Sequence, residues 1–309
     1  MSLEFKIYSP TDFPAYLPKL NQLYDQLFEG GKGFRARLVT QIAEFVSLDA
    51  STTSLLAQTV EFIHNSSLLH DDLIDKAPMR RGKAAAWMEY GPEYTVLAGD
   101  YLLARVVLNL SQHGHIGLVQ ITGKALSDLL EGEWLQDSIR HDISVTWEQM
   151  DRIHRLKTSS LFSWCIKAPF VFKNYSDDIV NLLSEMGDDL GALLQRSDDL
   201  LDFNIRNAEG KTTFTDLKAG YLNLFSIELF QTPEQRQKAF QLQSLEQVYE
   251  LVGQQKFEHA LNAFDTKNAK LIAGVVQKAA KIQEKCNLSP DFVEFVEAIA
   301  TKIYWRDQL

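Results

Sequence analysis

Apolar positions along the chain recur at spacings of three and four residues, which places them on one face of an α-helix. Windows that alternate apolar and polar residues, as half-buried β-strands do, are few. The eight prolines leave uninterrupted runs at 93–168, 170–232 and 234–289. Such runs permit long helices, because proline breaks the helical hydrogen-bond pattern. The pattern therefore predicts an all-α fold.

Two local signals place helix starts. Thr146 followed by Gln149 predicts a capping box, in which each side chain hydrogen-bonds the backbone of the other residue. Ser289 followed by Pro290 predicts an N-cap with proline at the first helical position. We therefore expect one helix to begin after Thr146 and another after Ser289.

Loop-like stretches at 30–33, 76–92 and 204–222 are expected to interrupt the helices, because turn-forming residues gather there. The composition does not change across them, and no short-period repeat or low-complexity tract divides the chain. We therefore predict a single domain over residues 1–309.

Composition and charge narrow the function classes. Apolar residues make up 45% of the 309-residue chain and charged residues 23%, as in soluble globular proteins. The net charge of −10 disfavours binding to nucleic acid or to anionic lipid. Cys165 and Cys286 are too few for a disulfide framework, and neither a secretory signal nor a stretch of about 20 apolar residues is recognisable. We therefore expect a cytoplasmic protein with no transmembrane segment and no nucleic-acid partner.

Two segments of the chain carry the same arrangement of carboxylates. They are Asp71, Asp72 and Asp75 in the first acidic segment and Asp198, Asp199 and Asp202 in the second. Helical residues four apart lie one above the other, so the carboxylates within each segment are expected to converge. Chance predicts only about 0.1 such five-residue patterns in a chain of this composition. Two copies therefore point to a shared function.

Clustered carboxylates attract cations, because two of them roughly 5–6 Å apart repel by about 1 kcal/mol in water and more where water is excluded. Ordinary surface ion pairs are one source of cations, from Lys76, Arg80 and Arg81 or from Arg196, Arg206 and Lys211. Mg²⁺ is the other, since it binds one or two carboxylates together with substrate phosphates. Two such segments predict a diphosphate bridged by magnesium.

Basic residues that could hold a diphosphate lie near both acidic segments, although a solvated charged surface is the alternative for each taken singly. They are Lys32, Arg35, Arg37, Arg80, Arg81, Lys157 and Lys211.

These residues resemble the motifs of the trans-isoprenyl diphosphate synthase, or polyprenyl synthetase, family. Residues 30–35 are similar to its glycine-lysine segment, and residues 61–82 (EFIHNSSLLHDDLIDKAPMRRG) resemble its first aspartate-rich region. Further matches follow in the family's order, at 99–103, Gly132 and Glu133 with Gln136, 157–158, 191–202, 210–211 and 216–217. The resemblance covers about residues 28–225.

The resemblance implies an isoprenoid-synthase-type helical bundle in which both acidic segments face a central cavity. It implies head-to-tail prenyl transfer with three Mg²⁺ ions per active site. The implied metal ligands are Asp71, Asp75 and Asp198, with Asp72, Asp199 and Asp202 close by. The ions would neutralise the leaving diphosphate, the double bond of isopentenyl diphosphate would attack the allylic cation, and a proton would be lost.

The resemblance also implies roles for other side chains. Isopentenyl diphosphate would be held by Lys32, Arg35, His64 and Arg81, the allylic diphosphate by Arg80, Lys157 and Lys211, and the reacting centre would be lined by Thr158 and Gln195. His64 lies seven residues before Asp71, about two turns along the same helix face, which agrees with its role. A hydrogen-bonded core histidine is the alternative.

Four positions depart from the family pattern. Its second lysine, in a Gly-Lys-x-Thr pattern, corresponds to Tyr221, and its threonine to Asn223. Arg196 stands where an aliphatic residue is usual, and Gly33 replaces a common arginine. These changes could weaken binding of the allylic diphosphate, or Arg196 could point outward without effect.

Product length is expected to depend on the residues that precede Asp71. Ser67 and Ser66, four and five positions earlier, replace the bulky aromatic residues that stop the growing chain in short-chain members of the family. An open tunnel at this level predicts a medium- or long-chain product. The next side chains that could stop the chain are Ile63 and Val60, about one further turn each, or Leu129 and Leu130 from a facing helix.

Three other functions remain open. Geranylgeranyl or farnesyl diphosphate synthesis differs only in product length. A non-catalytic subunit of a heteromeric prenyltransferase would keep the fold without turnover, although both acidic segments are intact. A terpene cyclase would have no use for Lys32, Arg35 and His64. The family usually forms symmetric homodimers, and the apolar runs 96–110 and 118–135 could supply the interface or belong to the core.

Overall fold

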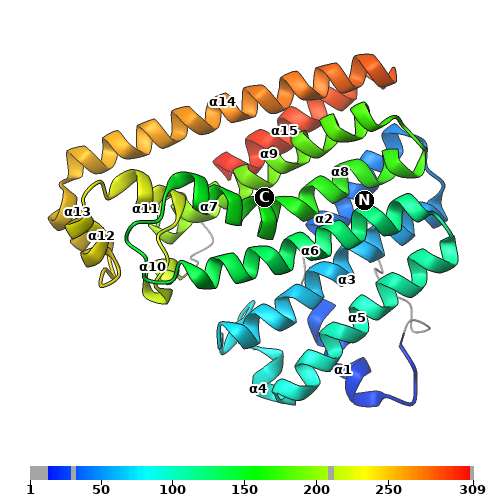
Figure 1. Cartoon of the computed structure of the whole chain (residues 1–309), viewed down its shortest axis with the longest axis horizontal. Coiled ribbons are helices and arrows are strands. Elements are labelled where there is room, and N and C mark those ends of the chain that lie inside the picture. Colours follow the sequence, from blue (N-terminus) through cyan, green and yellow to red (C-terminus); the bar gives the residue numbers. More distant parts are fainter. Residues whose placement is uncertain (1–12, 29–32, 208–211, 307–309) are drawn as a thin grey trace. The chain divides into compact units, whose positions relative to one another are not determined.

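The computed structural model describes residues 13–28, 33–207 and 212–306, and almost all of the regular structure there is helical, which confirms the all-α prediction (Figure 1). The helices are α1 (Pro18–Phe28), α2 (Phe34–Phe45), α3 (Ala50–Ile74), α4 (Ala86–Tyr90), α5 (Pro92–His113), α6 (Ile116–Ser138), α7 (Trp147–His154), α8 (Ser160–Phe172), α9 (Asp177–Asp202), α10 (Thr215–Ala219), α11 (Leu224–Leu229), α12 (Pro233–Ala239), α13 (Leu245–Val252), α14 (Gln254–Cys286) and α15 (Asp291–Trp305). A single π-helical turn, here called the π-turn (Arg155–Ser159), connects α7 to α8.

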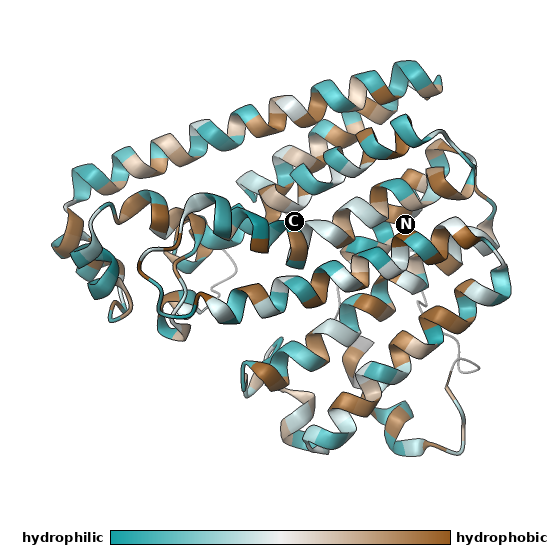
Figure 2. Ribbon diagram, in the orientation of Figure 1, coloured by the Kyte–Doolittle hydropathy of each residue, from teal (hydrophilic) through white to brown (hydrophobic). Residues whose placement is uncertain are grey.

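The helices are amphipathic, as the three- and four-residue spacing predicts. Figure 2 shows apolar and polar residues alternating around most of them. The predicted capping box of Thr146 and Gln149 is present at the start of α7. The prediction for Ser289 is wrong by one residue, because α15 begins at Asp291 with Pro290 as its N-cap. The turn in which Phe292 N–H donates to the carbonyl of Ser289 overlaps the first residues of this helix.

Two of the predicted loops contain short elements. Strands β1 (Met79–Arg80) and β2 (Lys83–Ala84) pair antiparallel within residues 76–92, and α4 follows them. Helix α10 lies within residues 204–222. These elements are too short for a periodic pattern to indicate, so the sequence predicted only loops.

The chain divides into two compact units. Unit 1 comprises the described residues of 1–123 and 164–175. Its centre is α3, which packs against α2 and α5. The hydroxyl of Tyr24 on α1 donates to the carbonyl of Ala98 on α5 at 2.9 Å, and Trp164 Nε1 donates to Thr122 Oγ1 at 2.9 Å. These buried polar contacts join α1 to α5 and α8 to the start of α6 within unit 1.

Unit 2 comprises residues 124–163 and the described residues of 176–309. Its centre is α9, which packs against the π-turn, α11, α14 and α15. The core contains Phe203, Phe225 and Phe264, whose rings meet edge to face with Phe225 in the middle. That both units belong to one domain over residues 1–309 stays a prediction.

None of the described helices is both long and apolar enough to cross a membrane.

Candidate functional site

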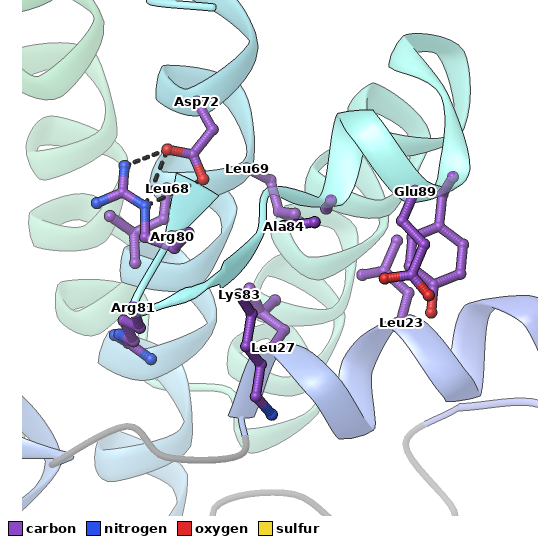
Figure 3. A pocket seen from close by; sticks show the side chains of 12 residues that line it. Leu23, Leu27, Leu68, Leu69, Asp72, Arg80, Arg81, Lys83, Ala84 and Glu89 are labelled. Atoms are coloured by element: carbon purple, nitrogen blue, oxygen red, sulfur yellow. Dashed lines mark hydrogen bonds and ion pairs between the residues drawn. The ribbon is translucent and has the colours of Figure 1, made fainter. Parts of the chain in front are cut away.

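The first acidic segment forms the end of α3. Asp72 is buried, and Arg80 of β1 donates from Nε to its two carboxylate oxygens at 2.9 and 3.0 Å, with a further contact from Nη2 (Figure 3). Burial lowers the pKa of Arg80, but its hydrogen bonds and charge pairing with Asp72, together with the charges of Asp71 and Asp75, raise that pKa above its ordinary value. Arg80 therefore contacts Asp72 directly and lies near enough to Asp71 and Asp75 to feel their charges.

A second group of cations surrounds His64, further toward the start of α3. Arg35 Nη1 lies 3.2 Å from His64 Nε2, and since arginine only donates, Nε2 accepts. Burial and the charges of Arg35, Arg81 and Arg80 hold the pKa of His64 well below its ordinary value. His64 is therefore neutral, with its proton on Nδ1, among three positive charges. Such a group suits an anion with several oxygens.

A pocket of about 640 Å³ lies beside this group in unit 1 (Figure 3). Its walls combine leucine side chains with basic and acidic groups. The lining residues include Leu23, Leu27, Leu68, Leu69, Asp72, Arg80, Arg81, Lys83 and Glu89. A small ligand with an anionic head and an apolar body matches this lining.

The start of α2 brings Arg35 to His64. Gly33 is the N-cap of α2 and has φ of 54°, a left-handed conformation that glycine adopts without strain. The carboxylate of Glu61 on α3 accepts from the backbone N–H of Ala36 at 3.0 Å, where glycine offers no capping side chain. The glycine that replaces the family's arginine therefore fits the turn. Lys32 and Lys211 lie outside the described residues.

The second acidic segment forms the end of α9, and two of its carboxylates have backbone partners. Asp199 is fully buried and accepts from Leu224 N–H at 3.0 Å. Asp202 accepts from the N–H and hydroxyl of Thr215 at 2.6 and 2.8 Å, and so caps the start of α10. Asp198 is paired with Arg306, whose Nε also donates to Ser197 Oγ at 2.8 Å.

Asp216 of α10 joins the second acidic segment. Burial and the charge of Asp202 raise its pKa to about 7, with a further contribution from Asp198. Burial, and after it the charge of Asp216, raises the pKa of Asp199 well above its ordinary value. Four carboxylates therefore gather here. The sequence indicated Asp216 only as part of a family motif, because it lies 18 residues beyond Asp198 and outside the repeated pattern.

The π-turn places two predicted residues beside this group. Thr158 Oγ1 donates to Gln195 Oε1 at 2.9 Å, so the two residues predicted to line the reacting centre are in contact. Lys157 Nζ lies 2.5 Å from Glu133 Oε2 and 3.0 Å from Gln136 Oε1. The charge of Lys157 also lowers the pKa of Asp216, against the larger effect of burial, which shows that the two are near.

Two glycines allow the π-turn to approach the neighbouring helices. A Cβ at Gly132 on α6 would lie 2.7 Å from Cγ and 3.1 Å from the backbone N of Lys157. A Cβ at Gly191 on α9 would collide with the backbone of Ser159. Single π-turns within helices are often found at functional sites. Their hydrogen bonding departs from the helix pattern by one residue, which periodicity does not reveal.

The carboxylates fit magnesium in their chemistry. Within the described ranges, no three His, Cys, Asp or Glu side chains form a ready-made metal site. Both acidic segments nevertheless offer oxygen donors only. In the second, burial and, after it, repulsion between the carboxylates raise the pKa values of Asp199 and Asp216, and a hard divalent cation would relieve the repulsion. Asp72, Asp199 and Asp202 accept from Arg80, Leu224 and Thr215, and Asp198 pairs with Arg306. It is the family resemblance that assigns Asp71, Asp75 and Asp198 as direct ligands.

The four residues predicted to control product length lie on α3. Ser66 is buried and donates from Oγ to the carbonyl of Gly99 on α5 at 2.9 Å. Ser67 Oγ donates to the carbonyl of His64. Ile63 and Val60 are 1% and 0% exposed. Each could stop a growing product chain only if that chain entered the core of unit 1. On α6, Leu130 is 64% exposed and Leu129 half-buried.

The departures from the family pattern have structural partners. Arg196 is buried and points into unit 2, where it pairs with Asp151, so it does not point outward. Asn223 donates to Asp216 at 2.9 Å and accepts from Ser226 N–H at the start of α11. The guanidinium of Arg140 lies 6.0 Å from the ring centre of Tyr221.

Comparisons with known proteins agree with these motifs. The profile of one protein family, described as Polyprenyl synthetase, matches residues 17–265. The octaprenyl diphosphate synthase of Escherichia coli (strain K12) is 32% identical over 222 residues, which are 71% of this chain and 69% of that protein. Solanesyl-diphosphate synthase 2, chloroplastic, of Oryza sativa subsp. japonica is 35% identical over 214 residues, which are 66% of this chain and 53% of that protein.

Solved structures share the fold. The crystal structure of a decaprenyl diphosphate synthase from Rhodobacter capsulatus matches with a TM-score of 0.82 at 28% identity, and the match covers 96% of this chain and 93% of that one.

Proposed function

The chain belongs to the polyprenyl synthetase family, and from this we propose that it is a Mg²⁺-dependent prenyltransferase that makes a medium- or long-chain polyprenyl diphosphate. It would join isopentenyl diphosphate head-to-tail to an allylic diphosphate. The observation that carries the proposal is that each acidic segment lies beside cationic side chains that suit a diphosphate.

Asp71, Asp75 and Asp198 would bind the Mg²⁺ ions, three per active site, that hold the allylic diphosphate, with Arg80, Lys157 and Lys211 as donors to the same group. Bound Mg²⁺ supplies positive charge that stabilises the departing diphosphate. Arg80 neutralises Asp72, while Leu224 and Thr215 hold Asp199 and Asp202, so these carboxylates support the direct ligands.

Arg35, His64 and Arg81, with Lys32, would hold the diphosphate of isopentenyl diphosphate. The neutral His64 can donate one hydrogen bond from Nδ1 while its Nε2 orients Arg35. The leucine-lined pocket next to Arg81 would accept the five-carbon body of this substrate. Thr158 and Gln195 would line the reacting centre.

Two observations favour a medium- or long-chain product over geranylgeranyl or farnesyl diphosphate. The relatives are octaprenyl, solanesyl and decaprenyl diphosphate synthases, and the side chains at Ser66 and Ser67 are small. A non-catalytic subunit is disfavoured because both acidic segments are complete. We also propose that the chain acts as a homodimer in the cytoplasm.

The test uses the purified chain alone, with Mg²⁺, farnesyl diphosphate and labelled isopentenyl diphosphate. We expect a product longer than geranylgeranyl diphosphate by mass spectrometry, and no product when Mg²⁺ is chelated. Release of no diphosphate by a folded chain would instead identify it as a partner subunit. A product that stops at geranylgeranyl diphosphate would overturn the chain-length proposal alone.

Ser66→Phe is expected to shorten the product. Ser66 is buried where α3 meets the carbonyl of Gly99, so a phenylalanine must take space from any chain that passes this level. The substitution is also expected to cost about 1–3 kcal/mol of stability through overpacking. Product distributions by mass spectrometry provide the measurement. Ser54→Phe, the same change at an exposed position of α3, is the control, and an unchanged length in Ser66→Phe would place the stop elsewhere.

A further inference from the structure

Arg196, the residue of α9 that departs most from the family pattern in charge, is buried among partners from two other helices. Its Nη2 lies 2.7 Å from Asp151 Oδ1 on α7, and its Nη1 donates to Asn268 Oδ1 on α14 at 3.0 Å. Its guanidinium lies 5.3 Å from the ring centre of Trp147 on α7. Through Trp147 and Asp151, Arg196 therefore connects the start and the middle of α7 to α9.

Asp151 carries this link to the π-turn. Its second oxygen accepts from Arg155 Nε at 2.7 Å, and Arg155 is the first residue of the π-turn. Arg155 also lies 3.6 Å from Asp189 on α9, whose carboxylate accepts from Lys278 on α14 at 2.6 Å. The carboxylate of Asp151 thus bridges Arg196 and Arg155. Because Arg155 is the first residue of the π-turn, this bridge fixes the position at which the π-turn begins.

The geometry of the π-turn decides where Lys157 and Thr158 point. A π-turn contains about one more residue than an α-helical turn, so its loss would rotate the side chains that follow by about 100°. Thr158 would then leave Gln195, and Lys157 would leave Glu133 and Gln136.

We propose that Arg196 is a positioning residue that acts through Asp151 and Arg155 to hold Lys157 and Thr158 in place for the allylic diphosphate. The inference deepens the proposed function and rests on it for the identity of the ligand. The link between Arg196 and the π-turn stands on the contacts alone. The sequence places Arg196 next to Gln195, but its side chain contacts Asp151, Asn268 and Trp147, which are not among the proposed reacting groups.

The experiment is a double-mutant cycle between Arg196→Met and Lys157→Met. We expect Arg196→Met to raise the KM for farnesyl diphosphate about tenfold, with the KM for isopentenyl diphosphate within about twofold. In the Lys157→Met background, Arg196→Met is expected to change the KM for farnesyl diphosphate by no more than about twofold, because the residue through which it acts is gone. Equal effects in both backgrounds would overturn the proposal.

Asp151→Asn provides a milder variant, since an amide keeps the shape of the carboxylate and one acceptor. It is expected to raise the same KM in the same direction. Arg152→Met is the matched control on α7, because Arg152 is exposed and pairs with Glu131, at 2.6 Å, rather than with Asp151 or Arg155. Its KM values should equal those of the unchanged chain.

Hydrogen exchange gives a readout that needs no activity. Arg196→Met and Asp151→Asn are expected to increase amide exchange across residues 155–160, while Arg152→Met does not. Normal exchange in folded Arg196→Met would overturn the proposal, whether or not the chain transfers prenyl groups. Failure of the proposed function would show differently, as an inactive unchanged chain in which Arg196→Met still loosens the π-turn.

Discussion

Asp198→Asn is expected to lower kcat by about 10²–10³-fold in a chain that remains folded, which is the usual effect of removing one group that stabilises charge in the transition state. Asp198 is the member of the second acidic segment whose side chain is 38% exposed, whereas Asp199 and Asp202 are buried on backbone donors. An amide keeps the shape of the side chain but not the charge that binds a hard cation. Steady-state kinetics at rising Mg²⁺ concentration, with circular dichroism for folding, provide the measurement.

Arg306→Met is the control for this substitution, because it removes the same ion pair and leaves the carboxylate. Its kcat should stay within a fewfold of the unchanged value. Asp71→Asn should match Asp198→Asn in size, since we propose that both acidic segments act on one diphosphate. A full kcat for Asp198→Asn at saturating substrate and Mg²⁺ would rule out its role as a metal ligand.

Features with a regular period were predictable from the sequence. The all-α fold followed from the spacing of apolar residues. Apolar residues three and four positions apart form one face of a helix, and that face packs against α3 in unit 1 or α9 in unit 2. The capping box at Thr146 followed from side-chain chemistry that acts over three residues. The two acidic segments were found because their helical spacing repeats, and the structure places both at the ends of long helices.

Features set by tertiary packing were not predictable. The π-turn depends on Gly132 and Gly191, which lie on other helices and leave room for its backbone. The inward direction of Arg196 depends on Asp151, 45 residues earlier in the chain. Asp216 joins the acidic group only because α10 folds back onto the end of α9. Each feature arises from contacts between distant residues, and one sequence alone does not reveal such contacts.

Asp216→Asn is expected to stabilise the metal-free chain at pH 8 by up to about 4 kcal/mol. Burial and the charge of Asp202 raise the pKa of Asp216 to about 7 in the folded chain, against an ordinary value of 3.8. The folded state therefore binds this proton more tightly than the unfolded state does. Protonation of Asp216 stabilises the folded chain in full below pH 3.8, and this stabilisation is lost as the pH rises through about 7. Asparagine removes this loss and keeps an oxygen that can accept from Asn223.

The measurement is thermal unfolding of both chains from pH 5 to pH 8 in a chelator, where 1 kcal/mol corresponds to roughly 2–4 °C for a chain of this size or somewhat smaller. Asp142→Asn is the control, and its effect on stability at pH 8 is expected to have the opposite sign. Hydrogen bonds from the hydroxyl and N–H of Ser144 lower the pKa of Asp142, so the charged carboxylate stabilises the folded chain and its loss destabilises it. Added Mg²⁺ should stabilise the unchanged chain more than Asp216→Asn, since the ion cancels the repulsion that the substitution removes. An Asp216→Asn chain that melts earlier than the unchanged chain at pH 8 without metal would show that the carboxylates are already balanced by protein donors, and the second acidic segment would then have no electrostatic need for a cation.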